Sequence, residues 1–405
     1  MRVALYGGSF NPPHRGHERA LCALMEETKP DRVFVIPAGA PPHKKIECAP
    51  PAELRLRLCR EAFLPLSEKI EVWDGELFSG KVNYTSETVR FFRERFPGDE
   101  ILFLTGTDMF LSFDTWHRAD YLFENLVIVC MPRDEETDAI LKKKAYYEAE
   151  FHAKILLLSE KPIIISSSEV RKEIERFGSS AALSPAVNEC VALNFLYGAG
   201  RDETKRRILS ILREKLPPER VRHTLSVERE CVRLCRYLGR EDLICGMSRA
   251  ALLHDLFRHS SPEEQTAYLR SAGKTAPRDL LDPPVLLHGF TASVFAEKEF
   301  ALPPEYARAI RFHTTGCRDM ALCDQILYLA DGIEETRVQP FLQKARRDFW
   351  DGADGEAPET HLKKACLAFL KGSCEHEKEK GKTVHPDTLF AIESLEKESE
   401  KDGST

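Results

Sequence analysis

The chain has 405 residues, a formal net charge of −7 and 42% hydrophobic residues, a length that predicts two domains, each able to bury a core. The negative charge disfavours a nucleic-acid partner, which needs a basic surface. No apolar run approaches the roughly 20 residues needed to cross a bilayer, and the start resembles no signal peptide. The 12 cysteines include no Cys-x-x-Cys pair, so we expect a reduced, cytoplasmic protein without disulfides. The lack of a long apolar run predicts no membrane partner.

The first half of the chain alternates short apolar runs with stretches of helical spacing. This alternation predicts an α/β domain over residues 1–198, a doubly wound, Rossmann-like parallel sheet with helices on both faces. Ligands of such sheets bind beyond the carboxyl ends of the strands. The expected strands are 2–6, 32–36, 69–73, 101–105, 126–130 and 154–158. The clearest expected helices are 17–28, 52–63, 85–95 and 168–176.

The most informative motif follows the first expected strand. Residues 7–17 read Gly-Gly-Ser-Phe-Asn-Pro-Pro-His-Arg-Gly-His and lead into a helix. The paired glycines let a ligand approach the backbone, and the helix start offers unpaired N–H groups and the positive end of the helix dipole. His14 and His17 lie three residues apart and can face the same anion. The loop residues that we assign to this phosphate site are Gly7, Gly8, Ser9, Phe10, His14 and His17.

The motif resembles that of the His-x-Gly-His nucleotidyltransferases, and its longer form is similar to nicotinate mononucleotide adenylyltransferases. That family joins ATP to nicotinate mononucleotide and releases pyrophosphate. The resemblance therefore implies that ATP, accompanied by Mg²⁺, and nicotinate mononucleotide bind the first domain. It also assigns Lys44, in a Pro-Pro-His-Lys loop after the second expected strand, to phosphate binding. A solvated surface lysine is the alternative for that position.

Further candidates follow the later strands. Tyr84 and Thr85 stand at the start of an expected helix, where Thr85 is a good cap and where the family contacts the nicotinate group. Gly106 and Asp108 follow the fourth expected strand, and Trp116 comes eight residues after Asp108. The resemblance implies that Asp108 helps to hold a nucleotide and that Trp116 stacks on the nicotinate ring, with core packing as the alternative for the indole. These features favour a pyridine nucleotide over pantetheine phosphate or a cytidylyl-type substrate.

A second phosphate cradle is expected near the end of this domain. Ser166, Ser167 and Ser168 follow an apolar run and begin a helix that carries Arg171. Hydroxyls, a helix N-terminus and a guanidinium together suit a phosphate, although an ordinary helix cap with a surface arginine is the alternative. The segment resembles the family motif Ile-Ser-Ser-Thr-x-Ile-Arg, with Ser168 and Val170 in place of the usual Thr and Ile. The resemblance assigns positive counter-charge for adenylyl transfer to four catalytic residues, His14, His17, Lys44 and Arg171.

The second half is almost wholly helical in pattern. A glycine-containing break at 198–200 precedes it, which suits a domain boundary. We expect an all-α domain over residues 203–385. Residues 386–405 are rich in Glu, Lys and Ser and are expected to form a charged tail, either a frayed helix or a disordered segment.

Histidines and aspartates in this half occur in apolar surroundings, such as Leu-Leu-His-Asp-Leu-Phe over residues 252–257. A buried histidine and carboxylate are costly unless they are satisfied, either by a metal ion or by a hydrogen bond to one another. A single pair favours the hydrogen bond, but a set of such positions favours a metal. The predicted metal ligands are His223, His254, Asp255, His288, His313 and Asp331.

These contexts resemble the HD-domain phosphohydrolases over roughly 203–345, and in particular bacterial enzymes that cleave diadenosine tetraphosphate into two ADP. The phrases that carry the resemblance are His-Thr-Leu-Ser-Val-Glu, Leu-Leu-His-Asp, Leu-Leu-His-Gly and His-Thr-Thr-Gly. It implies one or two divalent transition ions, iron or manganese, held by the six residues. Arg258 stands near a position where the family leads us to expect Lys.

Together the two halves predict a bifunctional enzyme. Two alternatives for the second half remain: a nucleotide-sensing module that regulates the first half, or a hydrolase of another phosphorylated nucleotide. The sequence leaves the oligomeric state open.

Overall fold

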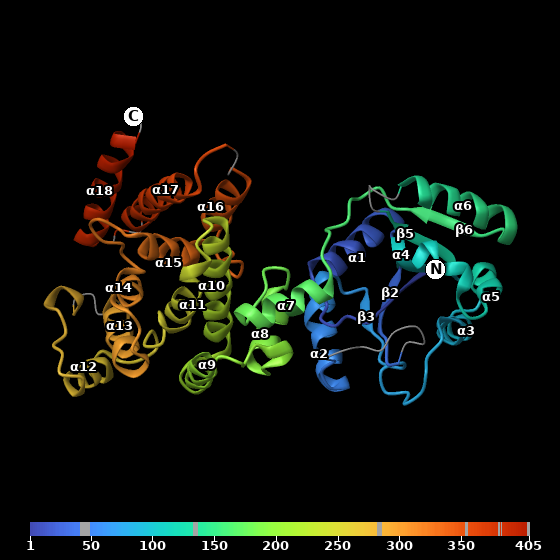
Figure 1. Ribbon diagram of the computed structural model, residues 1–405, viewed down its shortest axis with the longest axis horizontal. Helices are drawn as coiled ribbons and strands as arrows, with labels where there is room; N and C mark the ends of the chain where they lie inside the picture. The colour runs from blue at the N-terminus through green and yellow to red at the C-terminus, as the bar shows by residue number, and fades with distance from the viewer. Residues whose placement is uncertain are drawn as a thin grey trace. The chain divides into compact units, whose positions relative to one another are not determined.

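The computed structural model describes residues 1–40, 49–132, 137–281, 286–352, 355–379, 381 and 383–402. The chain divides into two compact units. The N-terminal unit comprises Met1–Arg176 and Ala182–Tyr197, and the C-terminal unit comprises Phe177–Ala181 and Gly198–Thr405. Figure 1 colours the chain from blue in the N-terminal unit to red at the end of the C-terminal unit. The domain limits of 1–198 and 203–385 stay predictions.

The N-terminal unit contains one six-stranded sheet, in which all neighbouring strands are parallel. The order β3-β2-β1-β4-β5-β6 confirms the predicted doubly wound α/β fold. The strand order reverses between β1 and β4, so the crevice at their carboxyl ends is the position where such folds bind ligands. The strands are β1 (Arg2–Gly8), β2 (Arg32–Pro37), β3 (Ile70–Val72), β4 (Glu100–Gly106), β5 (Val127–Met131) and β6 (Lys154–Leu157).

Helices connect these strands and shield an apolar interior. Residues of β1 and β4 such as Leu5 and Phe103 pack with helix residues such as Phe92 and Phe123 in one core. Because helices cover the sheet, its strands are apolar runs rather than alternating patterns. The helices are α1 (Arg15–Thr28), α2 (Ala52–Phe63), α3 (Thr85–Arg95), α4 (Thr107–Leu111), α5 (Ala119–Asn125), α6 (Thr137–Phe151), α7 (Ser167–Phe177) and α8 (Pro185–Leu193).

The described part of the C-terminal unit is helical, which confirms the predicted all-α class (Figure 1). Helix α10 packs against α11 and α15, and it buries Cys231 and Cys235. Among the described residues, no helix combines the length and the hydropathy that a membrane span requires. The first helices are α9 (Glu203–Lys215), α10 (Pro218–Tyr237), α11 (Ile244–Leu253), α12 (Pro262–Ser271) and α13 (Leu287–Phe300). The later ones are α14 (Pro304–Phe312), α15 (Leu322–Ile333), α16 (Pro340–Asp351), α17 (Pro358–Glu379) and α18 (Pro386–Asp402).

The end of the chain corrects one expectation. The segment 386–405 was expected to be a frayed or disordered charged tail, but helix α18 packs against α17. Ala391 and Leu395 are fully buried, one helical turn apart. A narrow apolar stripe in a highly charged segment is therefore enough to dock this helix.

Candidate active sites

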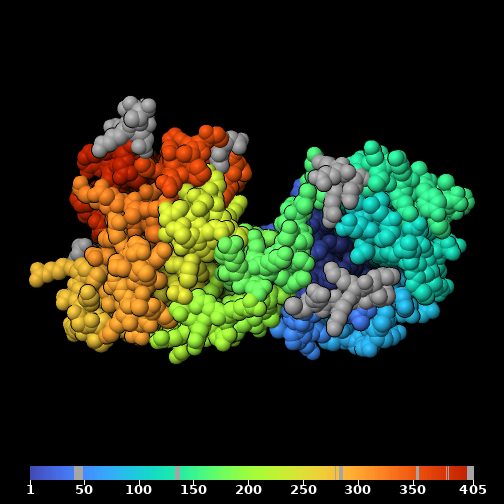
Figure 2. Space-filling view, in the orientation of Figure 1, coloured from blue at the N-terminus to red at the C-terminus, as the bar shows by residue number. Residues whose placement is uncertain are grey.

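Two cavities open beside the carboxyl ends of β1 and β4. One has a volume of about 210 Å³ and the other about 550 Å³. Residues 6–9 at the end of β1 and residues 104–106 at the end of β4 line both, so the cavities share a wall. We call the smaller the tryptophan cavity, after Trp116, and the larger the histidine cavity, after His14 and His17. In Figure 2 the dark-blue start of the chain lies in a recess between cyan and green segments.

His14 and His17 line the histidine cavity as a closely packed pair. Their ring centroids lie 3.8 Å apart, and the His14 backbone N–H donates to Nδ1 of His17 at 3.2 Å. Because that nitrogen accepts, a neutral His17 ring carries its proton on Nε2 and can donate it to a ligand. Burial lowers the pKa of His14 to about 4, and burial together with His14 holds the pKa of His17 well below its usual value. Both imidazoles are thus neutral at pH 7.

Close packing leaves little room for a side chain at two glycines of this loop, Gly8 and Gly16. A Cβ on Gly8 would lie 2.9 Å from the Phe10 ring. A Cβ on Gly16 would lie 3.1 Å from the carbonyl oxygen of Ile163 and 3.2 Å from the His14 ring. Phe10 is fully buried and packs edge-on against His17, with centroids 5.1 Å apart. Phe10 therefore supports the histidine pair from behind.

The start of α7 is joined to the same loop. Arg171 Nη1 donates to the carbonyl oxygen of Asn11 at 2.8 Å, and Arg171 Nη2 donates to Ser168 Oγ at 3.2 Å. The Ser167 hydroxyl donates to another carbonyl of the loop at 3.2 Å. Ser166 and Ser167 line the histidine cavity, whereas Ser168 and Arg171 are outside its lining. The two predicted phosphate cradles therefore meet at one cavity.

The tryptophan cavity gathers residues predicted from separate strand ends. Tyr84, Thr85, Gly106 and Trp116 all line it. One face of the Trp116 indole stacks on the buried Phe113 ring, with centroids 4.7 Å apart, so core packing and cavity lining hold together for this residue.

One predicted residue of the N-terminal unit lies apart from both cavities, and another is not described. Asp108 is exposed in the first turn of α4 and lines neither cavity. Lys44 lies outside the described residues.

Two residues that contact the cavity walls were missed by the sequence analysis. Arg55 of α2 is almost fully buried, and its guanidinium donates to the Ser9 carbonyl oxygen at 2.6 Å. An arginine among the apolar positions of a helix was the available signal. His117 packs on Tyr84, with centroids 4.3 Å apart, and its Nδ1 lies 3.1 Å from Ser86 Oγ. Only its place beside Trp116 pointed to it.

In the C-terminal unit, the packed helices bring all six predicted ligand residues together. Asp255, just after α11, stands at the centre. Its Oδ1 lies 3.2 Å from His288 Nε2 and 3.7 Å from His313 Nε2. Its Oδ2 lies 3.5 Å from His254 Nε2 and 3.7 Å from His223 Nε2. Residues from α10, α13 and the ends of α11 and α14 thus converge on one carboxylate.

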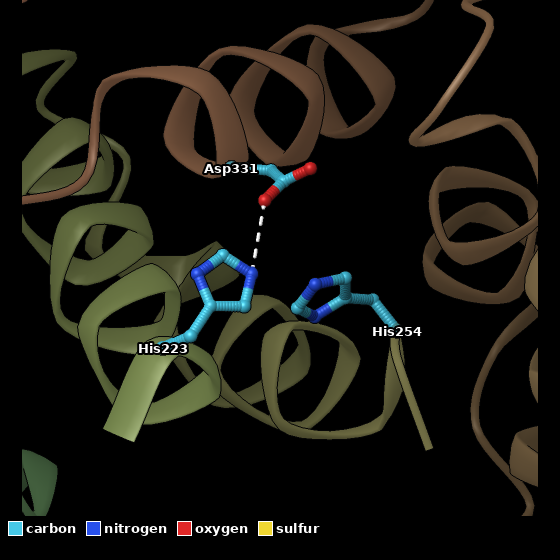
Figure 3. Close-up of side chains that lie close together, drawn as sticks. All are labelled: His223, His254 and Asp331. Atoms are coloured by element: carbon cyan, nitrogen blue, oxygen red, sulfur yellow. Dashed lines mark ion pairs between the residues drawn. The ribbon is translucent and has the colours of Figure 1, made fainter. Parts of the chain in front are cut away.

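Two overlapping groups have the spacing of metal ligands. His223, His254 and Asp331 form one group, and His254, Asp255 and His313 form the other, with ligand atoms within 4.8 Å of one another. Figure 3 shows the first group, in which His223 Nε2 lies 3.1 Å from Asp331 Oδ1. Mixed imidazole and carboxylate ligands suit a divalent transition ion.

The hydrogen bonds of the imidazoles also fit a metal ion. Nδ1 of His254 and Nδ1 of His313 lie 2.6 and 2.7 Å from main-chain carbonyl oxygens. Because a carbonyl oxygen only accepts, each ring carries its proton on Nδ1, and the lone pair of Nε2 faces the centre. Nε2 of His254 is buried and has no hydrogen-bond partner. A cation at the centre would satisfy it.

The pKa values of the cluster are shifted so that His223 is protonated and the two aspartates are ionised. Burial opposes protonation of His223, but its hydrogen bonds to Asp331 and Glu334 outweigh burial and raise its pKa to about 9. Burial likewise favours neutral Asp255 and Asp331, but the surrounding histidines, and Arg337 beside Asp331, hold both pKa values well below the usual range. Both aspartates are therefore ionised, and their oxygens are available as ligands for a cation.

Arginines border the cluster. Arg220 Nη1 donates to Asp255 Oδ2 at 2.8 Å, and Arg337 donates to the Asp331 carboxylate. Arg258, where Lys was expected, has Nη1 3.3 Å from His288 Nδ1. Guanidinium groups beside a candidate metal centre suit a phosphate ligand.

Comparison with known proteins separates the two halves of the chain. The cytidylyltransferase-like family matches residues 5–173, and the HD domain family matches residues 220–336. A Clostridium acetobutylicum crystal structure, described as a "predicted HD superfamily hydrolase involved in NAD metabolism", is 26% identical, with a TM-score of 0.42. The alignment covers 48% of this chain and 97% of that one.

Two relatives match the N-terminal half. A "Probable nicotinate-nucleotide adenylyltransferase" of Clostridium novyi is 31% identical over 191 residues, which are 47% of this chain and 95% of the relative. A Geobacter sulfurreducens protein of the same name is 33% identical over 195 residues, covering 44% of this chain and 89% of the relative. From these relatives and the two family matches, the chain belongs to the nicotinate-nucleotide adenylyltransferase family and carries a C-terminal HD domain.

Proposed function

We propose that the N-terminal unit transfers the adenylyl group of ATP to nicotinate mononucleotide, forming deamido-NAD and pyrophosphate for NAD biosynthesis. One observation carries this proposal: the histidine cavity and the tryptophan cavity share the wall made by the ends of β1 and β4. ATP in the first and the acceptor in the second would meet at that wall. The names of the two relatives agree with this reaction.

The transfer needs positive charge rather than a protein nucleophile. An oxygen of the acceptor phosphate attacks the α-phosphorus of ATP, and the bond to the β-phosphate oxygen breaks. His14 and His17 would donate hydrogen bonds to the transferring group, and the N-termini of α1 and α7 would face its negative charge. Arg171 would add a cationic guanidinium, and Lys44 keeps its predicted role at the phosphates. Mg²⁺ carried with ATP would neutralise the phosphate oxygens.

A comparison of acceptors tests this proposal. Purified full-length protein with ATP should use nicotinate mononucleotide much faster than nicotinamide mononucleotide. Equal rates would contradict the assignment to the acid. Turnover of pantetheine phosphate or a cytidylyl-type substrate instead would contradict the pyridine assignment altogether.

We propose that the C-terminal unit is a metal-dependent phosphohydrolase that cleaves diadenosine tetraphosphate symmetrically into two ADP. The convergence of four imidazoles and two carboxylates carries this proposal. His223, His254 and Asp331 would hold one ion, and His254, Asp255 and His313, with His288 beside them, a second. Bound iron or manganese would supply Lewis-acid activation of the phosphoryl group and a water of lowered pKa. Arg220 and Arg258 would bind phosphate oxygens at the border.

Anaerobic purification with metal analysis, followed by a hydrolysis assay, tests the second proposal. We expect bound transition metal and release of ADP from diadenosine tetraphosphate with Fe²⁺ or Mn²⁺. Tight nucleotide binding without hydrolysis would favour the sensing module. Faster release of phosphate from another nucleotide would show that diadenosine tetraphosphate is not the substrate, although the unit would still be a phosphohydrolase.

A further inference from the structure

Nδ1 of His223 contacts a buried carboxylate, whereas Nδ1 of each of two neighbouring histidines contacts a main-chain carbonyl oxygen. Nδ1 of His254 and of His313 lie against main-chain carbonyl oxygens. Nδ1 of His223 lies 3.1 Å from Oε1 of Glu334, which comes from the end of α15. Glu334 is absent from both ligand groups. Among these three rings, only His223 is backed by a carboxylate.

Glu334 is held firmly in place. It is fully buried, and its backbone leaves the helical conformation at the C-terminus of α15. The Thr336 N–H donates to Oε2 at 2.6 Å, and the Thr336 hydroxyl donates to Oε1 at 2.6 Å. Arg337 Nε lies 3.6 Å from Oε1. A buried carboxylate with this many donors is fixed in orientation before any ligand arrives.

We infer that Glu334 is a positioning residue for the candidate metal ligand His223. A carboxylate oxygen accepts, so Nδ1 of His223 must carry the proton. With Nδ1 held by Glu334, Nε2 is the nitrogen that faces Asp331 and His254, and it would bind a metal ion in place of any proton it carries (Figure 3). A carboxylate behind an imidazole also makes the imidazole a more basic ligand. The inference rests on the proposed metal site and extends it to a residue that touches neither ion nor substrate.

The position of Glu334 in the chain gives it a second consequence. Asp331 lies three residues earlier on α15, so one helix end supplies a candidate ligand and the support of a ligand from α10. A shift of the end of α15 would disturb both at once. The first ligand group therefore depends on α15 more than the second group does.

Metal affinity of three full-length variants tests the inference. Protein stripped of metal is titrated with Mn²⁺, and free Mn²⁺ is read by electron paramagnetic resonance. Glu334→Ala should weaken Mn²⁺ binding about 10–100-fold, the usual cost of losing such a partner. Glu334→Gln should weaken it less, because the amide oxygen can still accept from Nδ1.

Thr336→Val is the matched control. It removes one hydrogen bond to Glu334 and leaves the contact between Glu334 and His223, so Mn²⁺ affinity should stay within about twofold of the original protein. Thermal unfolding followed by circular dichroism reports whether each variant is folded. If the Ala variant does not fold, the Gln variant and the Val control still decide the matter.

Two results would overturn the role of Glu334: unchanged Mn²⁺ affinity in folded Glu334 variants, or a Thr336→Val loss as large as that of Glu334→Ala. The second result would show that Glu334 only stabilises the local structure and does not orient His223. Failure of the proposed metal site is a different outcome. In that case neither the original protein nor the His254→Ala variant would retain Mn²⁺, and both proposals would fall together.

Discussion

The two sites handle histidine in opposite ways. His14 in the N-terminal unit is buried, and burial lowers its pKa to about 4. His223 in the C-terminal unit is equally buried, but Asp331 and Glu334 raise its pKa to about 9. The first site offers neutral donors to an incoming anion, whereas the second surrounds its histidines with ionised carboxylates that can bind a cation. Burial alone does not decide the role of an imidazole; the charges that share the burial do.

The largest effect that this contrast predicts is that a substitution in either site abolishes or slows the activity of that site and leaves the other activity intact. His17→Ala should slow adenylyl transfer about 10²–10³-fold, because one donor to the transferring phosphate is lost, and should leave hydrolysis intact. His254→Ala should abolish hydrolysis, because both ligand groups contain His254, and should spare adenylyl transfer. Both rates are measured on the same preparations, so each activity is the folding control for the other. Loss of both activities in either folded variant would refute separate sites.

Arg171 provides the next largest effect. Arg171→Met removes a guanidinium and its hydrogen bond to the Asn11 carbonyl, and should lower kcat/KM for ATP about 10²-fold. Lys172→Met is the matched control, since Lys172 is the exposed neighbour on the same helix. Equal effects of the two substitutions would reduce Arg171 to general surface charge.

Features that depend on local residue order could be predicted from the sequence, whereas contacts between residues far apart in the chain could not. The strands, the turn that carries His14 and His17 and the helix start at Ser167 depend on local residue order and were predictable. The hydrogen bond from Arg55 to Ser9 spans 46 residues, and the contact of His223 with Glu334 spans 111. Nothing in the spacing of either pair shows that they meet. The six candidate ligands were named from histidines and carboxylates in apolar surroundings and from a family resemblance, not from their spacing along the chain.

The sequence also did not show which side chains are exposed and which are buried. Asp108 has the sequence position of a ligand-binding carboxylate, yet it is exposed and outside both cavity linings. The segment of helix α18 was expected to be a frayed helix or disordered because charge dominates its composition, and only its stripe of Ala391 and Leu395 indicated docking. Composition averages over a segment, whereas packing depends on a few positions.

A smaller and more selective effect is expected at the tryptophan cavity. Trp116→Ala should raise the KM of the acceptor about tenfold through lost ring contact and leave the KM of ATP unchanged, because Trp116 lines the tryptophan cavity alone. Trp73→Phe is the control, since Trp73 lines neither cavity. Steady-state kinetics with each substrate varied in turn give both constants. An equal rise in both KM values would indicate that Trp116 acts through the core and its Phe113 contact.

The smallest effect concerns stability in mild acid. The folded-state pKa of His14, about 4, lies below its ordinary value of 6.5. Between these two pH values, His14 is therefore protonated in the unfolded chain and neutral in the folded chain. Stability is therefore lost as pH falls from 6.5 toward 4, and between pH 7.5 and 6.0 this residue should account for about 0.8 kcal/mol. His14→Gln should reduce the fall by that amount, as measured by urea unfolding with pulsed hydrogen exchange in β1 and β4, strands of the N-terminal unit alone. His152→Gln is the control, since no hydrogen bond or ring contact ties that residue to the pair. An identical pH dependence in the original protein and His14→Gln would mean that His14 titrates normally, and the neutral-donor description of the first site would fail.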